Sequence, residues 1–241
     1  MTKEEIRQQI WRLMEAKGVV RFPGAVGRIP NFTGAELAAR QLQKSPVWQS
    51  ARVIKSNPDS PQREVRHLAL KEGKIVYMAV PRLRSPRCFI ELDPARIKAN
   101  LYHASSIKGA FKYGKSVLPQ EVKGIELVVC GSVAVNTQGA RVGKGGGYSD
   151  LEYALLTEMG KISPRTPIVT TVHPLQMVNF PMQMKVHDIP VDYIITPEEL
   201  ITTHTSFPRP PGVCWDLLDK EKLELIPILK ILKPQSRMES T

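Results

Sequence analysis

The stretch from residue 139 to residue 150 combines a glycine-rich turn with charged side chains. Four closely spaced glycines lie within it: Gly143, Gly145, Gly146 and Gly147. A turn without β-carbons lets backbone N–H groups approach a phosphate chain. Arg141 is suited to forked contacts with phosphate oxygens, and Lys144 adds a point charge beside them. This pattern predicts a turn that binds polyphosphate.

A helix is expected directly after this turn, at residues 148–160. Its apolar residues repeat on one face: Leu151, Ala154, Leu155 and Met159. The helix would direct the positive end of its dipole at the turn, and Asp150 could hold Mg²⁺ against the same phosphates. The alternative is a purely structural strand-to-helix connection with Asp150 as a helix cap. On the magnesium reading, replacing Asp150 with Asn should remove the magnesium dependence and leave the fold intact.

The spacing of this turn departs from two common phosphate-binding patterns. A GxxxxGK[ST] loop is excluded because Lys144 is followed by Gly145. A GxGxxG fingerprint is excluded because Tyr148 stands where its last glycine would be. The anion site is therefore predicted from the glycines and the two cations rather than from a standard motif.

The composition excludes several protein classes. The chain has 241 residues, 42% of them hydrophobic, which is enough for a well-formed core. It has no apolar run of membrane-spanning length, and a charged N-terminus replaces a secretory signal, so we expect no membrane association and a cytoplasmic location. Three distant cysteines exclude a disulfide scaffold and a zinc module. The net charge of +11 indicates an anionic partner.

Apolar runs alternate with helical patterns along most of the chain. Strands are expected at residues 51–56, 74–80, 125–135, 166–172 and 191–196, and helices at residues 61–71, 94–103 and 217–225 as well as after the glycine turn. Near-continuous apolar strands have both faces covered. The sequence thus predicts a doubly wound, mainly parallel sheet with helices on both faces, a Rossmann-like arrangement of three layers. Ligands of such sheets bind beyond the carboxyl ends of the strands.

The first fifty residues are expected to form a helical segment packed on this domain. Thr2 and Glu5 predict a capping box, and the helix that follows should run to Gly18. Lys3 and Arg7 lie one turn apart at the edge of its apolar stripe. Residues 18–34 read as an ordered loop or an insertion, and residues 35–44 as a second helix. We expect one domain over residues 1–241, with a loose tail at residues 234–241.

Three segments resemble one enzyme family. The sequence RVGKGGGYSD, residues 141–150, resembles the RLGxGxGYYD signature of the 5-formyltetrahydrofolate cyclo-ligases. Lys3 and Arg7 match the KxxLR element of that family, and residues 187–196 match its late HDxxxDxxxT segment. The segments RIPNF, GSVAV and SDLEYAL are most similar to a divergent branch, the methenyltetrahydrofolate synthase domain-containing branch.

The resemblance implies an ATP- and Mg²⁺-dependent ligase that closes N5-formyltetrahydrofolate to 5,10-methenyltetrahydrofolate. The formyl oxygen is phosphorylated, N10 attacks, and phosphate leaves, so the chemistry depends on charge neutralisation and alignment. By position, Arg141 and Lys144 would be catalytic cations, and Asp150 and Asp192 would hold magnesium. The remaining expected contacts to nucleotide come from Lys3, Arg7, Gly143, Gly145, Gly146, Gly147 and Tyr148. Tyr148 and Glu64 would contact the reduced folate.

Other functions remain open at this stage. Ser149 replaces the second tyrosine of the signature, and Glu64 lies in an altered segment, which favours a paralogue that keeps the nucleotide site but has lost or changed the reaction. A nucleic-acid-binding protein would explain the charge of +11, but only 6% of the residues are aromatic, so nucleic acid is an unlikely partner. His173 and His187 read as structural residues at least as readily as catalytic ones. The oligomeric state is not predicted.

Overall fold

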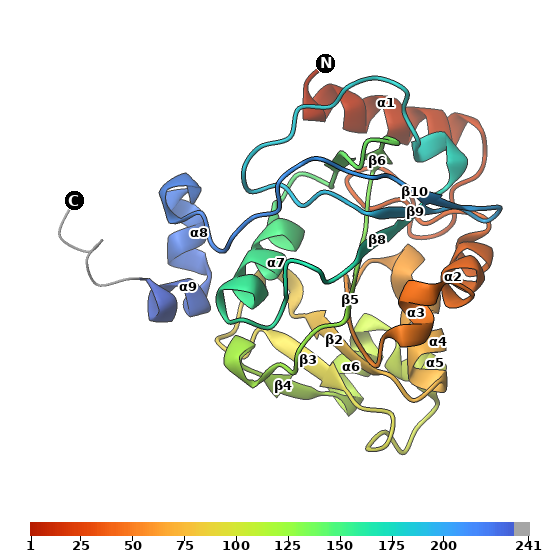
Figure 1. Ribbon diagram of the computed structural model, residues 1–241. Coiled ribbons are helices and arrows are strands. Elements are labelled where there is room, and N and C mark those ends of the chain that lie inside the picture. The colour runs from red at the N-terminus through yellow and green to blue at the C-terminus, as the bar shows by residue number, and fades with distance from the viewer. Residues whose placement is uncertain (234–241) are drawn as a thin grey trace.

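A mostly parallel sheet forms the centre of the computed structural model, which describes residues 1–233 (Figure 1). Its strands are β1 (Val53–Ser56), β2 (Ile75–Ala79), β3 (Phe89–Leu92), β4 (Lys115–Val117), β5 (Leu127–Cys130), β8 (Ile168–Thr171), β9 (Tyr193–Ile195) and β10 (Leu200–Thr202). Their order is β10-β9-β8-β5-β1-β2-β3-β4. The run from β9 to β2 is parallel, while β10, β3 and β4 pair antiparallel at the edges. The predicted α/β class is confirmed, and the sequence had indicated only the parallel strands.

The predicted strand at residues 125–135 is interrupted. It leaves the sheet after Cys130, and β6 (Ala134–Val135) pairs instead with β7 (Arg141–Val142) in a separate two-stranded sheet. Gly131 lies at this exit, where a β-carbon would approach the Ile29 side chain to 2.9 Å. The continuous apolar composition concealed the break, since both parts are buried.

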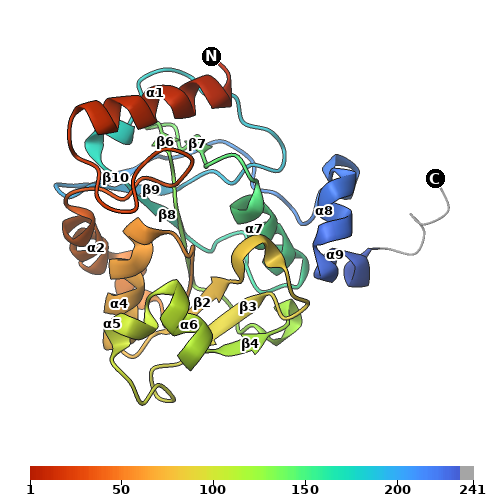
Figure 2. The same ribbon diagram turned by 180° about the vertical axis from the view of Figure 1, so that it is seen from behind.

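Helices cover both faces of the sheet (Figures 1 and 2). One side carries α2 (Ala35–Gln43), α3 (Pro46–Ser50), α4 (Arg63–Lys71), α5 (Leu101–Ala104) and α6 (Ile107–Tyr113). The other side carries α7 (Tyr148–Glu158), α8 (Lys220–Leu225) and α9 (Pro227–Leu232). The first helix, α1 (Lys3–Ala16), crosses the end of the sheet near β6 and β7. Short 3-10 turns occur at Ser60–Gln62, Pro81–Leu83, Pro119–Glu121, Pro174–Gln176 and Trp215–Leu217.

The helix boundaries correct two sequence-based expectations. The helix predicted at residues 94–103 is wrong, because α5 begins only at Leu101, where the Asn100 side chain caps it. The helix predicted at residues 217–225 begins at Lys220, capped by Asp219. The capping box of Thr2 and Glu5 at the start of α1 is confirmed. The tail predicted at residues 234–241 lies outside the described residues, and the single-domain organisation stays a prediction.

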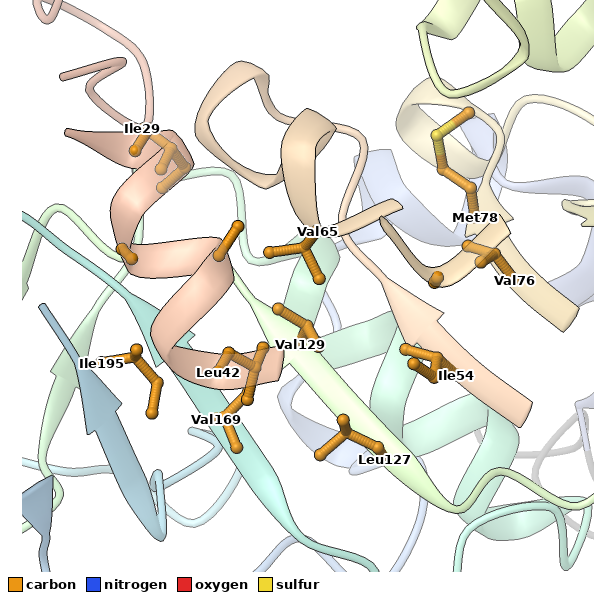
Figure 3. Close-up of a cluster of buried hydrophobic side chains, with 14 of the residues drawn as sticks. Ile29, Leu42, Ile54, Val65, Val76, Met78, Leu127, Val129, Val169 and Ile195 are labelled. Carbon is orange, nitrogen blue, oxygen red and sulfur yellow. The ribbon is translucent and has the colours of Figure 1, made fainter. Parts of the chain in front are cut away.

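Alternate residues along the strands face opposite helix layers, as the pleat of a β-strand requires. Ile54, Val129 and Val169 join the core under α2 and α4, and Figure 3 shows Leu42 of α2 above this layer. Val128 and Ile168 join the core under α7. Among residues 1–233, no helix has both the length and the apolar character needed to cross a lipid bilayer.

Residues 18–34 form an ordered loop beside α1. Val20 forms an antiparallel bridge with Phe32, whose side chain is fully buried. The indole N–H of Trp11 donates to the Arg28 carbonyl oxygen at 3.0 Å. These contacts hold the loop against the body of the protein, where it helps to enclose the cavity described below.

The core beneath α2 yields a stability prediction. Leu42 is fully buried, so Leu42→Ala should lower the free energy of unfolding by about 3 kcal/mol through lost burial and the cavity left behind. Leu37 on the same helix is 49% exposed, and Leu37→Ala should change it by less than about 1 kcal/mol. Urea denaturation measures both, and equal losses would contradict the assigned packing.

Candidate functional site

A cavity of about 460 Å³ lies where the carboxyl ends of β1, β2 and β5 meet. Asn57 follows β1, Arg82 follows β2, and Gly131 follows β5, and all three line the cavity. After β1 the chain builds the sheet towards β2, whereas β5 lies on the opposite side of β1. Such a reversal leaves a crevice at the end of the sheet, which is the usual ligand site of an open α/β fold.

The glycine turn forms one wall of this cavity and leads directly into α7 (Figure 2). Gly145 and Gly147 have φ angles of 107° and 67°, a conformation that side chains disfavour. A β-carbon on Gly146 would lie 2.8 Å from the Tyr148 ring. The turn therefore presents bare backbone to the cavity at Gly143, Gly146 and Gly147, next to the first turn of α7.

Helix α1 supports the turn from the side away from the cavity. The Nε of Arg7 donates to the Gly143 carbonyl oxygen at 2.7 Å, and its guanidinium carbon lies 3.5 Å from a β-carbon placed on Gly145. Lys3 forms an ion pair with Asp188. Neither Lys3 nor Arg7 lines the cavity. Arg7 therefore holds the turn and Lys3 holds Asp188, while the direct contact of both with the nucleotide stays a prediction.

Arg141 is buried beneath the turn and is held by three protein groups. It donates to the carbonyl oxygens of Gly131 and Ile189 and pairs with the Asp150 carboxylate. Burial by itself would lower the pKa of Arg141, but the Asp150 carboxylate outweighs it, and the net pKa is raised. Three of its five N–H groups are used internally, which leaves two for a ligand, and Arg141 is among the residues that line the cavity.

Asp150 is tied to the same network. One of its oxygens, Oδ1, accepts both from Arg141 and from the Ile189 backbone N–H, the latter at 3.1 Å. Its other oxygen, Oδ2, makes no hydrogen bond within residues 1–233, and Asp150 lines the cavity. The structure corrects the expectation that Asp150→Asn leaves the fold intact, because the substitution would leave Arg141 buried without its counter-ion.

Lys144 is the cation of the turn that stays accessible. Its side chain is 44% exposed, and its Nζ lies 2.6 Å from Oδ1 of Asp59, which follows β1. Both residues line the cavity. An anion entering beside the turn therefore meets Lys144 first.

A buried polar cluster lies at the cavity, and the sequence analysis did not assign three of its members, Lys55, Asn57 and Glu152, to the site; Asn57, Glu152 and Ser149 line the cavity. Lys55 of β1 and Glu152 of α7 are buried and form an ion pair with a distance of 2.7 Å between Nζ and Oε2. Asn57 donates to Glu152 at 3.3 Å, and Ser149 donates to Asn57 at 3.2 Å. Burial raises the pKa of Glu152, and the Lys55 ammonium opposes this shift. The sequence signal that could have identified this cluster is Lys55, a charged residue inside a predicted strand.

Two further cations line the cavity opposite the glycine turn. Arg28 comes from the loop at residues 18–34, and Arg82 comes from the segment after β2. Arg82 has a φ angle of 57°, which is rare for a residue with a side chain. The basic run at residues 81–87 reads from the sequence as a solvated loop that could also attract the glutamate tail of a folate, and the structure brings Arg82 to the cavity.

Two residues expected at the site lie elsewhere. Glu64 stands on α4 beside His67 and does not line the cavity. Asp192 lines a separate cavity of about 310 Å³, where Arg209 and the Ile168 N–H each approach its Oδ2 to 2.7 Å. The structure does not bring Asp150 and Asp192 together, because they line different cavities. Over residues 1–233, no group of three or more His, Cys, Asp or Glu side chains forms a metal cluster.

The two histidines considered from the sequence have structural contacts. His173 accepts from the Leu175 N–H at 3.1 Å and packs edge-on against Phe32. Burial lowers the pKa of His173, which favours its neutral form. His187 lies 3.9 Å from an Asp188 oxygen. Neither histidine lines the cavity.

Comparison with known proteins adds independent findings. Residues 1–197 match the model of the 5-formyltetrahydrofolate cyclo-ligase family. The chain is 41% identical over 238 residues to a methenyltetrahydrofolate synthase domain-containing protein of Bos taurus and 39% identical over 240 residues to that of Homo sapiens. In both cases 98% of this chain aligns, and it spans 63% of the length of the relative.

The fold also resembles a solved structure. A 5,10-methenyltetrahydrofolate synthetase of Aquifex aeolicus superposes with a TM-score of 0.53 and 17% identity, covering 86% of this chain and 96% of that one. At this identity the likeness supports the α/β fold alone.

The buried pair of Arg141 and Asp150 generates a prediction. Asp150→Asn should lower the free energy of unfolding by about 3 kcal/mol, because it leaves the Arg141 charge buried and uncompensated. Asp93→Asn is the matched control, since Asp93 pairs with the well-exposed Arg96 and should cost less than about 1 kcal/mol. Chemical denaturation at neutral pH compares the variants. Equal stabilities would show that the pair does not hold the turn.

Proposed function

The chain belongs to the 5-formyltetrahydrofolate cyclo-ligase family, and on this premise we propose that it closes N5-formyltetrahydrofolate to 5,10-methenyltetrahydrofolate with ATP and Mg²⁺. The observation that carries the proposal is the bare glycine turn with Lys144, placed on a cavity at the switch point of the sheet. Polyphosphate is the ligand class that such a turn accepts best.

The proposed reaction is a phosphoryl transfer followed by ring closure. The formyl oxygen takes the terminal phosphoryl group and ADP leaves. The N10 lone pair then attacks the formyl carbon, N10 loses its proton, and the formyl oxygen departs with inorganic phosphate. No step needs a protein nucleophile, because the chemistry depends on aligning the reactants and neutralising negative charge.

The chain would contribute positioning and positive charge. Backbone N–H groups at Gly146 and Gly147 and the first turn of α7 would hold phosphate oxygens. Lys144 would exchange its contact with Asp59 for the phosphates. Arg7, which binds the Gly143 carbonyl oxygen, and the buried Arg141 would hold the turn in its binding conformation.

The residues at the turn fit magnesium as well as phosphate. Mg²⁺ takes one or two carboxylates and completes its shell with phosphate oxygens and water. Asp150 offers its free Oδ2, and Asp59 faces the same cavity. Magnesium bound there would neutralise charge on the phosphates. In this proposal Asp59 takes the place expected for Asp192.

The rest of the cavity would hold the folate. Tyr148 and Ile107 provide apolar surface, while Arg28 and Arg82 add positive charge. The carboxylates of a folate's glutamate moiety are anionic groups that these arginines would attract. Glu64 has no part in this proposal because it lies outside the cavity.

A second candidate is a family member that binds nucleotide but has a changed or lost reaction. Ser149 favours it, because its hydroxyl contacts Asn57 where the family signature has an aromatic ring. This candidate and the cyclo-ligase predict the same ATP binding and differ in turnover.

We also propose a cytoplasmic location. Cys88, Cys130 and Cys214 are free thiols, and burial raises the pKa of each. Protonated, unpaired thiols suit a reducing compartment.

ATP binding can be tested at Lys144. Lys144→Ala should weaken ATP binding about thirtyfold, the effect of losing roughly 2 kcal/mol of charge-assisted contact. Lys71→Ala on α4 is the control, since Lys71 is exposed on a different element and its loss should leave the affinity unchanged. Isothermal titration calorimetry measures both. An unchanged affinity in Lys144→Ala would remove this residue from the site.

The reaction itself can be followed by absorbance. The protein with ATP, Mg²⁺ and 5-formyltetrahydrofolate should form the methenyl chromophore, and omission of any one component should prevent it. ATP binding without chromophore would contradict the cyclo-ligase assignment and support the candidate with a changed reaction.

A further inference from the structure

The buried ion pair of Lys55 and Glu152 has no part in the nucleotide half of the site. Lys55 is completely buried, and Glu152 is 4% exposed. Removing both charges from water is costly, and the attraction between them only partly offsets that cost. A charged pair kept beside a ligand cavity therefore points to a task in the cavity rather than to stability alone.

The hydrogen bonds around this pair occupy one oxygen of Glu152 and leave the other unused. The Oε2 atom of Glu152 accepts from both Lys55 and Asn57. The Oδ1 atom of Asn57 accepts from Lys55 at 3.4 Å and from Ser149 at 3.2 Å. Within residues 1–233, the Oε1 atom of Glu152 accepts no hydrogen bond. It is not one of the buried side-chain atoms that lack a hydrogen-bond partner, so part of its surface is accessible. Since Glu152 lines the cavity, its Oε1 is an acceptor left open to a ligand.

An open carboxylate oxygen selects ligands by their donors. An anionic group would be repelled by Glu152, and an apolar group would leave its Oε1 atom without a hydrogen-bond donor. A neutral nitrogen heterocycle with N–H groups on one edge satisfies the carboxylate and can pack flat against Tyr148. The amino-pyrimidinone edge of a reduced folate is such a group.

We propose that Glu152 is a specificity-determining residue whose Oε1 accepts an N–H from the heterocycle of the second substrate, with Lys55 as its positioning partner. This inference rests on the proposed function and deepens it, because it assigns the recognition of the heterocycle to a pair on β1 and α7. Asn57 and Ser149 complete the floor and fix the side chain of Glu152.

Lys55 holds Glu152 in place through the Oε2 atom of its carboxylate. Four groups face this carboxylate: Lys55 from β1, Asp59 from the segment after β1, Lys144 from the glycine turn, and Cys88 from the segment before β3. Burial and Asp59 raise the pKa of Glu152, whereas Lys55 and Lys144 lower it. Lys55→Met removes the ammonium that holds Oε2 of Glu152, so the preference for intact folate over a fragment without the heterocycle should fall.

The test measures folate and nucleotide binding separately. Glu152→Gln should weaken the binding of 5-formyltetrahydrofolate at least about tenfold and leave ATP affinity within about twofold. The fragment p-aminobenzoylglutamate, which lacks the heterocycle, should bind wild type and Glu152→Gln equally. Glu36→Gln is the matched control, because Glu36 pairs with Arg21 on the surface of α2 and should change neither affinity.

A second variant guards against misfolding. Lys55→Met with Glu152→Leu removes both charges together, which buried pairs tolerate better than the loss of one partner. This double variant should keep ATP binding and lose the preference for the intact folate over the fragment.

The outcomes separate the two proposals. Equal folate affinity in wild type and Glu152→Gln, or an unchanged preference for intact folate over the fragment in the double variant, would overturn the role of Glu152 and leave the proposed function standing. A wild-type protein that binds ATP but no reduced folate would overturn the proposed function and this inference with it.

Discussion

The site depends on the buried ion pair between Arg141 and Asp150. Arg141 lies on β7 and Asp150 lies in the first turn of α7, so their contact closes the chain around the glycine turn between them. A turn with several glycines has many conformations and loses much entropy when it is ordered. Arg141, with its further bonds to Gly131 and Ile189, and Arg7 from the opposite side offset that loss. The rigid turn is what allows the cavity to present bare N–H groups to a ligand.

The sequence predicted the elements that have a strong local pattern of their own. Continuous apolar runs identified the parallel strands, and the spacing around Thr2 and Glu5 identified the start of α1. The edge strands β3, β4 and β10 were missed because their pairing is antiparallel and is decided by neighbouring strands rather than by their own composition. The helix predicted at residues 94–103 failed because the Asn100 cap sets the start of α5 after most of that stretch.

The site was predictable for the turn but not for its surroundings. Glycines and cations close together in sequence indicated an anion site, and Lys144 and Tyr148 do line the cavity. An arginine beside a glycine turn indicates a phosphate ligand. The hydrogen bonds of Arg141 to the carbonyl oxygens of Gly131 and Ile189 could not be predicted from sequence spacing. Lys55 and Glu152 are almost a hundred residues apart, and only the packing of α7 on β1 brings them together. Asp192 matched by motif, but the pairing of β8 with β9 carries it to another cavity.

The most direct test of the account is a nuclear magnetic resonance titration with magnesium ATP that follows individual backbone amides. The largest chemical-shift changes should occur at the amides of Gly143, Gly146 and Gly147 and in the first turn of α7. The amides around Asp192 and Arg209 should change little. Shifts confined to the second cavity, or no shifts at the glycine turn at saturating nucleotide, would contradict this account.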